Sequence, residues 1–417
     1  MRIQIREMFN VDALRLPLAG IRIADFSWVG AGPFMTKPLA DHGADVVKIE
    51  SRVRTDVIRN MPPFRDGISG VNRSGYFANR NSSKRSICLD LHAQEGRALA
   101  LDLISKSDMV VNNFTPGTMD RLGLGYEDAR AVRSDVIYLE MPMQGSAGPH
   151  SGFRGFGLSI AAAGGLYGLS GYEDQEPVGT GTNYPDHVPN PLHGAVALLA
   201  ALRHRRKTGQ GSYIELAQIE STVNVIGAEI IAAAAGHTVT RRGNKDDESA
   251  PHGVYPSAGY DRWIAIAARS QEEWEATADV LGHPEWVTHS AYQSVGDRHE
   301  HHESLDALVA GETRRHSNVS LADRLSERGV PAAAVKDASE LVYGDAQLQA
   351  RDHWVILDHP EMGPSVYDGI PYRLTVTPGR LLSPAPLLGE HSKEVCIDLL
   401  GVTEERYAEL QETGIVG

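Results

Sequence analysis

Residues 21–50 read IRIADFSWVGAGPFMTKPLADHGADVVKIE, and this stretch decides the fold class. Two short runs of branched and apolar residues, 21–27 and 45–50, have the composition of buried strands. The residues between them have helical spacing and end at Gly43. A strand, a helix and a second strand in this order predict a βαβ unit whose two strands are parallel.

The same alternation continues beyond this unit. Apolar runs at 107–114 and 135–141 each follow a segment with helical spacing, at 95–106 and 126–134. We therefore expect an α/β fold built on a Rossmann-like parallel sheet that is buried on both faces. Residues 237–262 are polar and rich in turn formers, which indicates a boundary, and a hairpin and helices after it predict a smaller α/β domain.

Composition excludes several classes of function. The 417 residues carry a formal net charge of −14, which argues against a nucleic-acid partner. No apolar run approaches the roughly 18 residues that span a bilayer, and residues 1–12 are too charged for a signal peptide, so we expect a cytoplasmic protein without a membrane partner. Cys88 and Cys396 stand far apart, outside any cysteine or histidine cluster, and predict buried packing residues rather than a metal site or a disulfide.

The turn after the first predicted strand, VGAGPFM at 29–35, meets the dinucleotide motif GxGxxG only in part. Gly30 and Gly32 fit, but Met35 stands at the third glycine position. Glu50 ends the next strand, where a dinucleotide site would hold its ribose. A nicotinamide dehydrogenase is therefore an alternative, and the more general prediction is a helix N-terminus that faces a phosphate or a carboxylate.

Basic side chains gather in the same part of the chain. In an acidic protein such a cluster suits a polyphosphate ligand, although a solvated charged surface is the alternative. The cluster comprises Lys48, Arg52, Arg54, Arg59, Arg80, Lys84, Arg85 and Arg121. Asn113 and Phe114 add an amide and an aromatic face close to Arg121, a set that can hold an adenine and its phosphates.

A single carboxylate, Asp186, lies among three prolines in NYPDHVPNPLHG at 183–194. We expect a long helix to begin at Asn190 and Pro191 and to end at Gly209. Asp186 would then lie about one turn ahead of the positive end of the helix dipole, which favours its ionised form. A fixed, ionised carboxylate can serve as a base, a metal ligand or a nucleophile, and the alternative is a capping acid.

Five motifs in this order resemble the class III CoA-transferases, the family of formyl-CoA and carnitine-CoA transferases. They are residues 20–50, 81–91, 110–124, 180–211 and 384–395. The resemblance implies a large Rossmann-like domain, a small α/β domain inserted late in the chain, and a dimer of interlocked chains. With the composition changes above, we expect a large CoA-binding domain at 1–235, a linker at 236–262, a small α/β domain at 263–340 and a segment at 341–417 that returns to the large domain.

The resemblance also implies a site and a chemistry. Asp186 falls on the catalytic aspartate, which attacks an acyl-CoA to give a mixed anhydride and then an aspartyl-CoA thioester. Positions at or near the CoA site are Val29, Ala31, Leu89, Asn113, Phe114, Arg121 and Arg154, and the basic cluster adds Arg52, Lys84 and Arg85. CoA is thus expected as a substrate, with no tightly bound cofactor, and the partners are an acyl-CoA, a carboxylic acid and a second chain, identical or paralogous.

Acyl-CoA racemases share this fold and pair the aspartate with a histidine–aspartate dipeptide. A gapless comparison places Phe156 and Gly157 at those positions, and because neither takes a proton we favour a transferase. The segment YPDHVPNPLH and the GFG at 155–157 resemble the branch that uses succinyl-CoA with larger organic acids. A non-catalytic CoA-binding subunit of a heterodimer is a further alternative.

Overall fold

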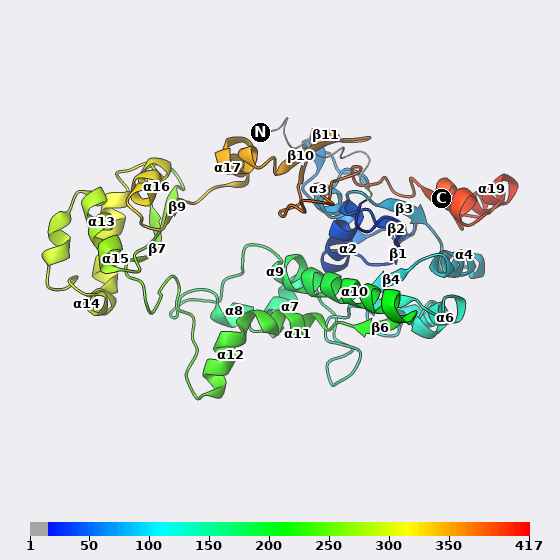
Figure 1. Cartoon of the computed structure of the whole chain (residues 1–417), viewed down its shortest axis with the longest axis horizontal. Coiled ribbons are helices and arrows are strands. Elements are labelled where there is room, and N and C mark those ends of the chain that lie inside the picture. The colour runs from blue at the N-terminus through cyan, green and yellow to red at the C-terminus, as the bar shows by residue number, and fades with distance from the viewer. Residues whose placement is uncertain (1–15) are drawn as a thin grey trace. The chain divides into compact units, whose positions relative to one another are not determined.

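The structure is a computed structural model that describes residues 16–417, and it divides into two compact units (Figure 1). Unit 1 holds the described residues up to Leu166 together with Gly179–His237 and Gln347–Gly417, and unit 2 holds Tyr167–Val178 and Thr238–Ala346. The charged N-terminal stretch and the start of the expected large domain lie outside the described residues. Within residues 16–417, no helix combines the length and the apolar character that crossing a bilayer requires.

Unit 1 is built on a six-stranded parallel sheet with the strand order β3-β2-β1-β4-β5-β6. The strands are β1 (Arg22–Asp25), β2 (Asp45–Glu50), β3 (Arg85–Cys88), β4 (Met109–Asn112), β5 (Ile137–Glu140) and β6 (Ser212–Glu215). This is the order of the Rossmann fold, in which the chain reverses its winding between the first and fourth strands. The α/β prediction and its four strands are confirmed, and β3 and β6 are additional.

Helices connect these strands, and α10 packs on both α2 and β5. The helices of unit 1 are α2 (Ala31–Asp41), α3 (Gly75–Arg80), α4 (Gln94–Ser105), α5 (Thr118–Arg121), α6 (Tyr126–Val132), α7 (Gly157–Ala163), α9 (Tyr184–His187), α10 (Pro189–Thr208), α11 (Gln218–Val223), α12 (Gly227–Ala234), α18 (Ser392–Glu394) and α19 (Glu404–Glu412). Two more, α8 (Leu166–Leu169) and α17 (Ala346–Ala350), fall at the unit boundaries, and a separate hairpin pairs β10 (Trp354–His359) with β11 (Gly363–Asp368).

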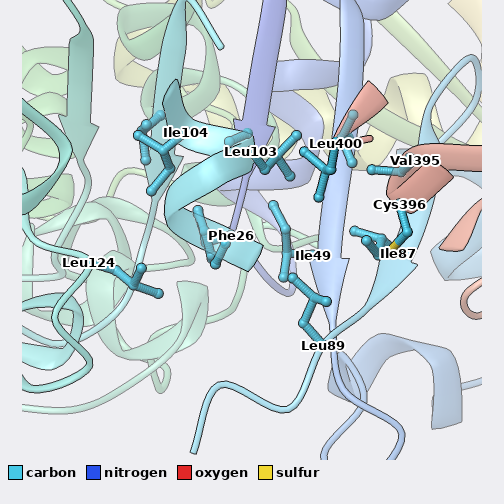
Figure 2. Close-up of a cluster of buried hydrophobic side chains, with 14 of the residues drawn as sticks. Phe26, Ile49, Ile87, Leu89, Leu103, Ile104, Leu124, Val395, Cys396 and Leu400 are labelled. Atoms are coloured by element: carbon cyan, nitrogen blue, oxygen red, sulfur yellow. The ribbon is translucent and has the colours of Figure 1, made fainter. Parts of the chain in front are cut away.

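The sheet of unit 1 is buried on both faces, as predicted. Successive residues of a strand point to opposite faces of the sheet. Val46 belongs to one hydrophobic cluster and Val47 to another, so each face is covered by its own cluster. One cluster joins strand residues to the end of the chain, and Figure 2 shows Val395, Cys396 and Leu400 among the side chains of the strands and α4. Residues 395–416 thus complete a core that begins at Ala24.

Unit 2 contains an antiparallel sheet of the order β7-β8-β9. Its strands are β7 (His252–Pro256), β8 (Trp263–Ala267) and β9 (Ala332–Ala334), and its helices are α13 (Gln271–Leu281), α14 (Val295–Glu300), α15 (His302–Thr313) and α16 (Asn318–Glu327). The hairpin predicted around 259–262 is confirmed. β7 lies inside the stretch 236–262 that we expected to be a linker, because Tyr255 packs in the core of unit 2 with Ile264 and Trp274.

Candidate active site

A cavity of about 420 Å³ lies where the loops after β1 and β4 meet in unit 1. These two strands are neighbours at the point where the winding of the sheet reverses, which is where open α/β sheets bind their ligands. The cavity is lined by Trp28, Val29, Gly30, Ala31, Arg54, Val57, Asn113, Phe114, Thr115, Pro116, Met143, Phe153, Arg154, Gly155, Phe156, Ile160, Asp186 and Gln218.

Asp186 lines this cavity from α9, a helix of a single turn, and it is 5% exposed. Burial raises the pKa of its carboxyl group to about 6, although the backbone N–H of Gly157 and the charge of Arg80 act in the opposite direction. The carboxylate is therefore the major form at neutral pH. It is nevertheless a stronger base than an exposed aspartate, and strong enough to be a useful nucleophile.

Two expectations about the segment around Asp186 are wrong. The long helix α10 begins at Pro189 rather than at Asn190 or Pro191, and its end at Gly209 is as predicted. The surroundings of Asp186 raise its pKa and so do not favour the ionised form as expected, because the loss of hydration in this buried position outweighs the Gly157 N–H and the charge of Arg80. The helix could be predicted from the sequence, but the burial of the Asp186 carboxylate could not.

The carboxylate lies directly against the backbone of α7. A β-carbon at Gly157, the first residue of that helix, would come within 2.6 Å of Asp186 Oδ2, closer than any real contact. A glycine at this position therefore allows a backbone N–H to approach the carboxylate, which a larger residue would push away. Asp186 itself is fixed by a 2.9 Å hydrogen bond from its N–H to the carbonyl oxygen of Asn183.

A buried ion pair holds the loop after β1 in place. Val29 adopts a positive φ of 68°, and its N–H donates to both carboxylate oxygens of Asp56, at 3.0 and 3.2 Å. Lys48 Nζ donates to Asp56 at 3.0 Å and to the carbonyl oxygen of Ser27 at 2.8 Å, and the side chains of Lys48 and Asp56 are fully buried. Lys48, predicted as part of a polyphosphate site, thus supports the loop that lines the cavity.

Five of the residues predicted to bind CoA line the cavity together with Asp186. They are Val29, Ala31, Asn113, Phe114 and Arg154. The side chain of Asn113 accepts a hydrogen bond from the N–H of Trp28 at 2.8 Å and donates to its carbonyl oxygen at 2.7 Å. This joins the β1 and β4 loops and sets the ring of Phe114 edge-on to that of Trp28, with 5.6 Å between centroids.

The other predicted CoA residues lie elsewhere in unit 1. Arg52 and Leu89 line a second cavity, of about 230 Å³, beyond the ends of β2 and β3. Arg121 is exposed on α5, where its guanidinium donates to Thr118 Oγ1 at 3.0 Å.

Lys84 and Arg85, both predicted to bind CoA, are instead paired with carboxylates of the fold. Lys84 is fully buried 3.4 Å from Asp25, and burial lowers its pKa to about 8. Arg85 pairs with Asp45 at 2.6 Å and with Glu394 at 3.0 Å. The structure does not bring either residue to the cavity of Asp186, because each is held by a carboxylate that lies far from it in the sequence.

Several features of the site carried no signal in the sequence. Gln218 and Met143 line the cavity from segments that no motif singled out. Arg80 belongs to the predicted basic cluster, but nothing in the sequence indicated that it contacts His187 from α3. Both cysteines are free and buried, as predicted, and burial raises the pKa of Cys88 to about 12 and that of Cys396 to about 11. Across the part of the chain that the structure describes, no three His, Cys, Asp or Glu side chains form a group able to hold a metal ion.

Known proteins are similar to this chain in sequence and in fold. The model of CoA-transferase family III matches residues 18–392. The chain is 31% identical to the succinyl-CoA–D-citramalate CoA-transferase of Chloroflexus aurantiacus, over 96% of this chain and 98% of that protein. It is also 31% identical to the beta subunit of the succinyl-CoA–L-malate CoA-transferase of the same organism, again over 96% of this chain and 98% of that protein.

A CaiB/BaiF family protein from Brucella suis has the same fold, with a TM-score of 0.84 and 28% identity over 93% of this chain and 100% of that one. The chain therefore belongs to CoA-transferase family III, as its motifs predicted.

Proposed function

We propose that this enzyme moves CoA from an acyl-CoA donor to a carboxylic acid, with Asp186 as the nucleophile. The observation that carries the proposal is the burial of a single carboxylate in a cavity that also contains five of the residues expected to bind CoA. The reaction needs no bound cofactor, because CoA enters as part of the donor and leaves as part of the product.

The proposed reaction proceeds through two covalent enzyme species. The Asp186 carboxylate attacks the thioester carbonyl, a C–O bond forms, and the C–S bond breaks to release CoA thiolate and leave a mixed anhydride. The thiolate then attacks the Asp186 carbonyl carbon, which gives an aspartyl-CoA thioester and frees the donor acid. The acceptor carboxylate repeats these steps in reverse, and the products are the acceptor acyl-CoA and free Asp186.

The surroundings of Asp186 suit this chemistry. At neutral pH the carboxylate is ionised, as attack requires, yet poorly hydrated and therefore reactive. The N–H of Gly157 points to the carboxylate and is our candidate for stabilising the oxyanion when the aspartyl carbonyl is attacked. Trp28 and Phe114, whose rings pack against each other, line the same cavity and would exclude water, which would otherwise hydrolyse the anhydride.

Succinyl-CoA is our first choice of donor. The two relatives described above are named for succinyl-CoA as donor and for D-citramalate or L-malate as acceptor. The cavity combines apolar side chains with the guanidinium groups of Arg54 and Arg154, which suits an acid with a second carboxylate. We therefore propose organic acids of this kind as acceptors.

A racemase of the same fold is less well supported. Racemisation needs a second group that takes or gives a proton at the α-carbon. Among the described residues that line the cavity none is a histidine. The gapless sequence comparison puts Phe156 and Gly157 at the positions of the racemase pair, and neither residue takes a proton. The nearby His187 accepts a hydrogen bond from Arg80 and does not line the cavity.

We further propose that two chains interlock to form the active enzyme. Helix α12 buries none of its residues within the single chain, and Ile231 on it is 72% exposed. Helix α10 likewise exposes Leu192 and Val196. An apolar surface of this kind suits contact with a second chain, identical or paralogous. The cytoplasmic location expected from the sequence is also part of the proposal.

Intact-protein mass spectrometry tests the proposal directly. The enzyme is mixed with succinyl-CoA, with a panel of other acyl-CoAs, and with each acyl-CoA plus an acceptor acid, and is then quenched with hydroxylamine or borohydride. A CoA adduct, an acyl adduct or the corresponding trapped product is expected in the native chain and not in Asp186→Ala. If the native chain forms no adduct with any donor although it binds CoA, the aspartyl route is excluded.

A further inference from the structure

A buried arginine contacts the residue next to the proposed nucleophile. Arg80, the last residue of α3, is 7% exposed, and its guanidinium carbon lies 4.6 Å from the ring centre of Phe34 and 5.0 Å from that of Tyr76. One of its terminal nitrogens, Nη1, donates to Asn79 Oδ1 at 2.8 Å. The other, Nη2, lies 2.5 Å from Nε2 of His187. Two aromatic rings and two hydrogen bonds thus hold the guanidinium in place.

This contact fixes the tautomer of His187. A guanidinium group has only donors, so His187 Nε2 must accept the hydrogen bond from Arg80. The remaining ring proton is then on Nδ1, which lies 2.8 Å from Thr182 Oγ1 and donates to it. Burial and the charge of Arg80 lower the pKa of His187 to about 4, which keeps the imidazole neutral at the pH of the cell.

His187 and Asp186 are neighbours in α9, which has only four residues and no side-chain cap. A helix this short is held by contacts rather than by its own hydrogen bonds. The bonds from His187 to Arg80 and to Thr182 join α9 to α3 on one side and to the preceding loop on the other. Neither Arg80 nor His187 lines the cavity, so neither is placed to touch a substrate there.

We propose that Arg80, acting through the neutral imidazole of His187, positions the Asp186 carboxylate for attack on the thioester. Arg80 and His187 are thus positioning residues and not catalytic ones. The inference rests on the proposed function, because it assigns these residues to the step that Asp186 performs. Arg80 is also the charged side chain whose field acts on the Asp186 carboxylate, and it favours the ionised form.

Two substitutions of His187 separate its two hydrogen bonds. In His187→Gln the amide oxygen reaches the place of Nε2 and accepts from Arg80, whereas the bond to Thr182 is lost. In His187→Asn the shorter amide takes the place of Nδ1 and donates to Thr182, whereas Arg80 loses its acceptor. Arg80→Lys keeps the charge but lacks the planar fork and the ring contacts.

The measurement is the single-turnover rate at which succinyl-CoA forms the covalent adduct. We expect His187→Asn and Arg80→Lys to lower this rate on the order of 10- to 100-fold, as a displacement of about 1 Å does, while the succinyl-CoA concentration at half-maximal rate stays the same. His187→Gln is expected to stay close to the native rate. If His187→Asn is as fast as His187→Gln, or if both variants lose rate and thermal stability together, His187 only fills space and the inference is wrong.

Crystal structures of the two His187 variants give a readout that does not depend on activity. The position of the Asp186 carboxylate is expected to shift in His187→Asn and to be kept in His187→Gln, and an unshifted carboxylate in both would overturn the inference. If the native chain forms no adduct, the proposed function fails on its own, and these structures still decide whether Arg80 positions Asp186.

Discussion

The backbone of Gly30 lies against the side chain of Asp186, so that a β-carbon at position 30 would come within 2.8 Å of Asp186 Cβ. Real β-carbons do not approach so closely, and the nucleophile would have to move. We expect Gly30→Ala to lower the rate of adduct formation on the order of 100-fold, measured by quenched-flow mass spectrometry. Gly152→Ala is the matched control, because a β-carbon there meets no other atom within 4 Å and the rate should stay at the native value. An unchanged rate in Gly30→Ala would show that the contact is not needed.

The raised pKa of Asp186 predicts a pH dependence for its acylation. Below a pH of about 6 the buried carboxyl group is protonated and cannot attack, so the single-turnover rate should rise with pH and level off above a midpoint near 6. The measurement is the rate of adduct formation across the range from pH 4.5 to 8, each point normalised to the fraction of folded enzyme. A midpoint near 4, the value of an exposed aspartate, would contradict the burial described above.

Removing the negative charge of Asp186 should stabilise the folded chain. Because the pKa of Asp186 is raised from 3.8 to about 6, the folded state loses stability as the pH rises from about 4 to 6, and the loss persists above 6. At about 1.4 kcal/mol for each pKa unit, this corresponds to roughly 2–3 kcal/mol. Asp186→Asn should therefore raise the free energy of unfolding by up to that amount at pH 8, and by little at pH 3.5. Urea unfolding at the two pH values checks this, and an equal effect at both would point to packing instead.

The buried pair beneath the β1 loop should matter both for stability and for CoA. Asp56→Asn leaves the Lys48 ammonium buried with a neutral neighbour, which typically costs about 3–5 kcal/mol, and it weakens the support of the Val29 N–H. We expect a lower unfolding midpoint in urea and a higher KM for the acyl-CoA. Asp247→Asn is the control, since its pair with Arg242 is exposed on both sides and should contribute about 0–1 kcal/mol. Equal effects of the two variants would refute the role assigned to Asp56.

Much of the fold follows from local sequence because its strands are runs of branched residues. β2 is DVVKIE and β4 is MVVN, and both are buried along almost their whole length. β3 and β6 read RSIC and SYIE, which contain few branched residues, and each becomes a strand by pairing with one neighbour, β2 or β5, at an edge of the sheet. The alternation of strands and helices was sufficient for the fold class, and the two outer strands needed the tertiary structure.

The candidate site could be predicted only for residues that belong to a recognisable motif and also lie at the end of a predicted strand. Val29, Asn113 and Phe114 stand at strand ends, and parallel strands bring those ends together. Lys84 and Arg85 stand in an equally basic stretch, but their carboxylate partners, Asp25 and Asp45, follow from sheet pairing and not from spacing. The pKa of Asp186 depends on its depth, which no local pattern records.

The way the chain completes its own core has a consequence for its synthesis. The apolar cluster of Figure 2 needs residues 395–416, whereas the segments of unit 2 end at Ala346. Domains fold as units while they leave the ribosome, so unit 2 can fold on the nascent chain. At that time one face of the parallel sheet in unit 1 still lacks the residues 395–416 that pack on it. Pulse proteolysis of stalled nascent chains should therefore find residues 238–346 protected first. Unit 1 should become resistant to the protease only after α19 has emerged. Its first strands are therefore among the last parts of the protein to have their core contacts completed.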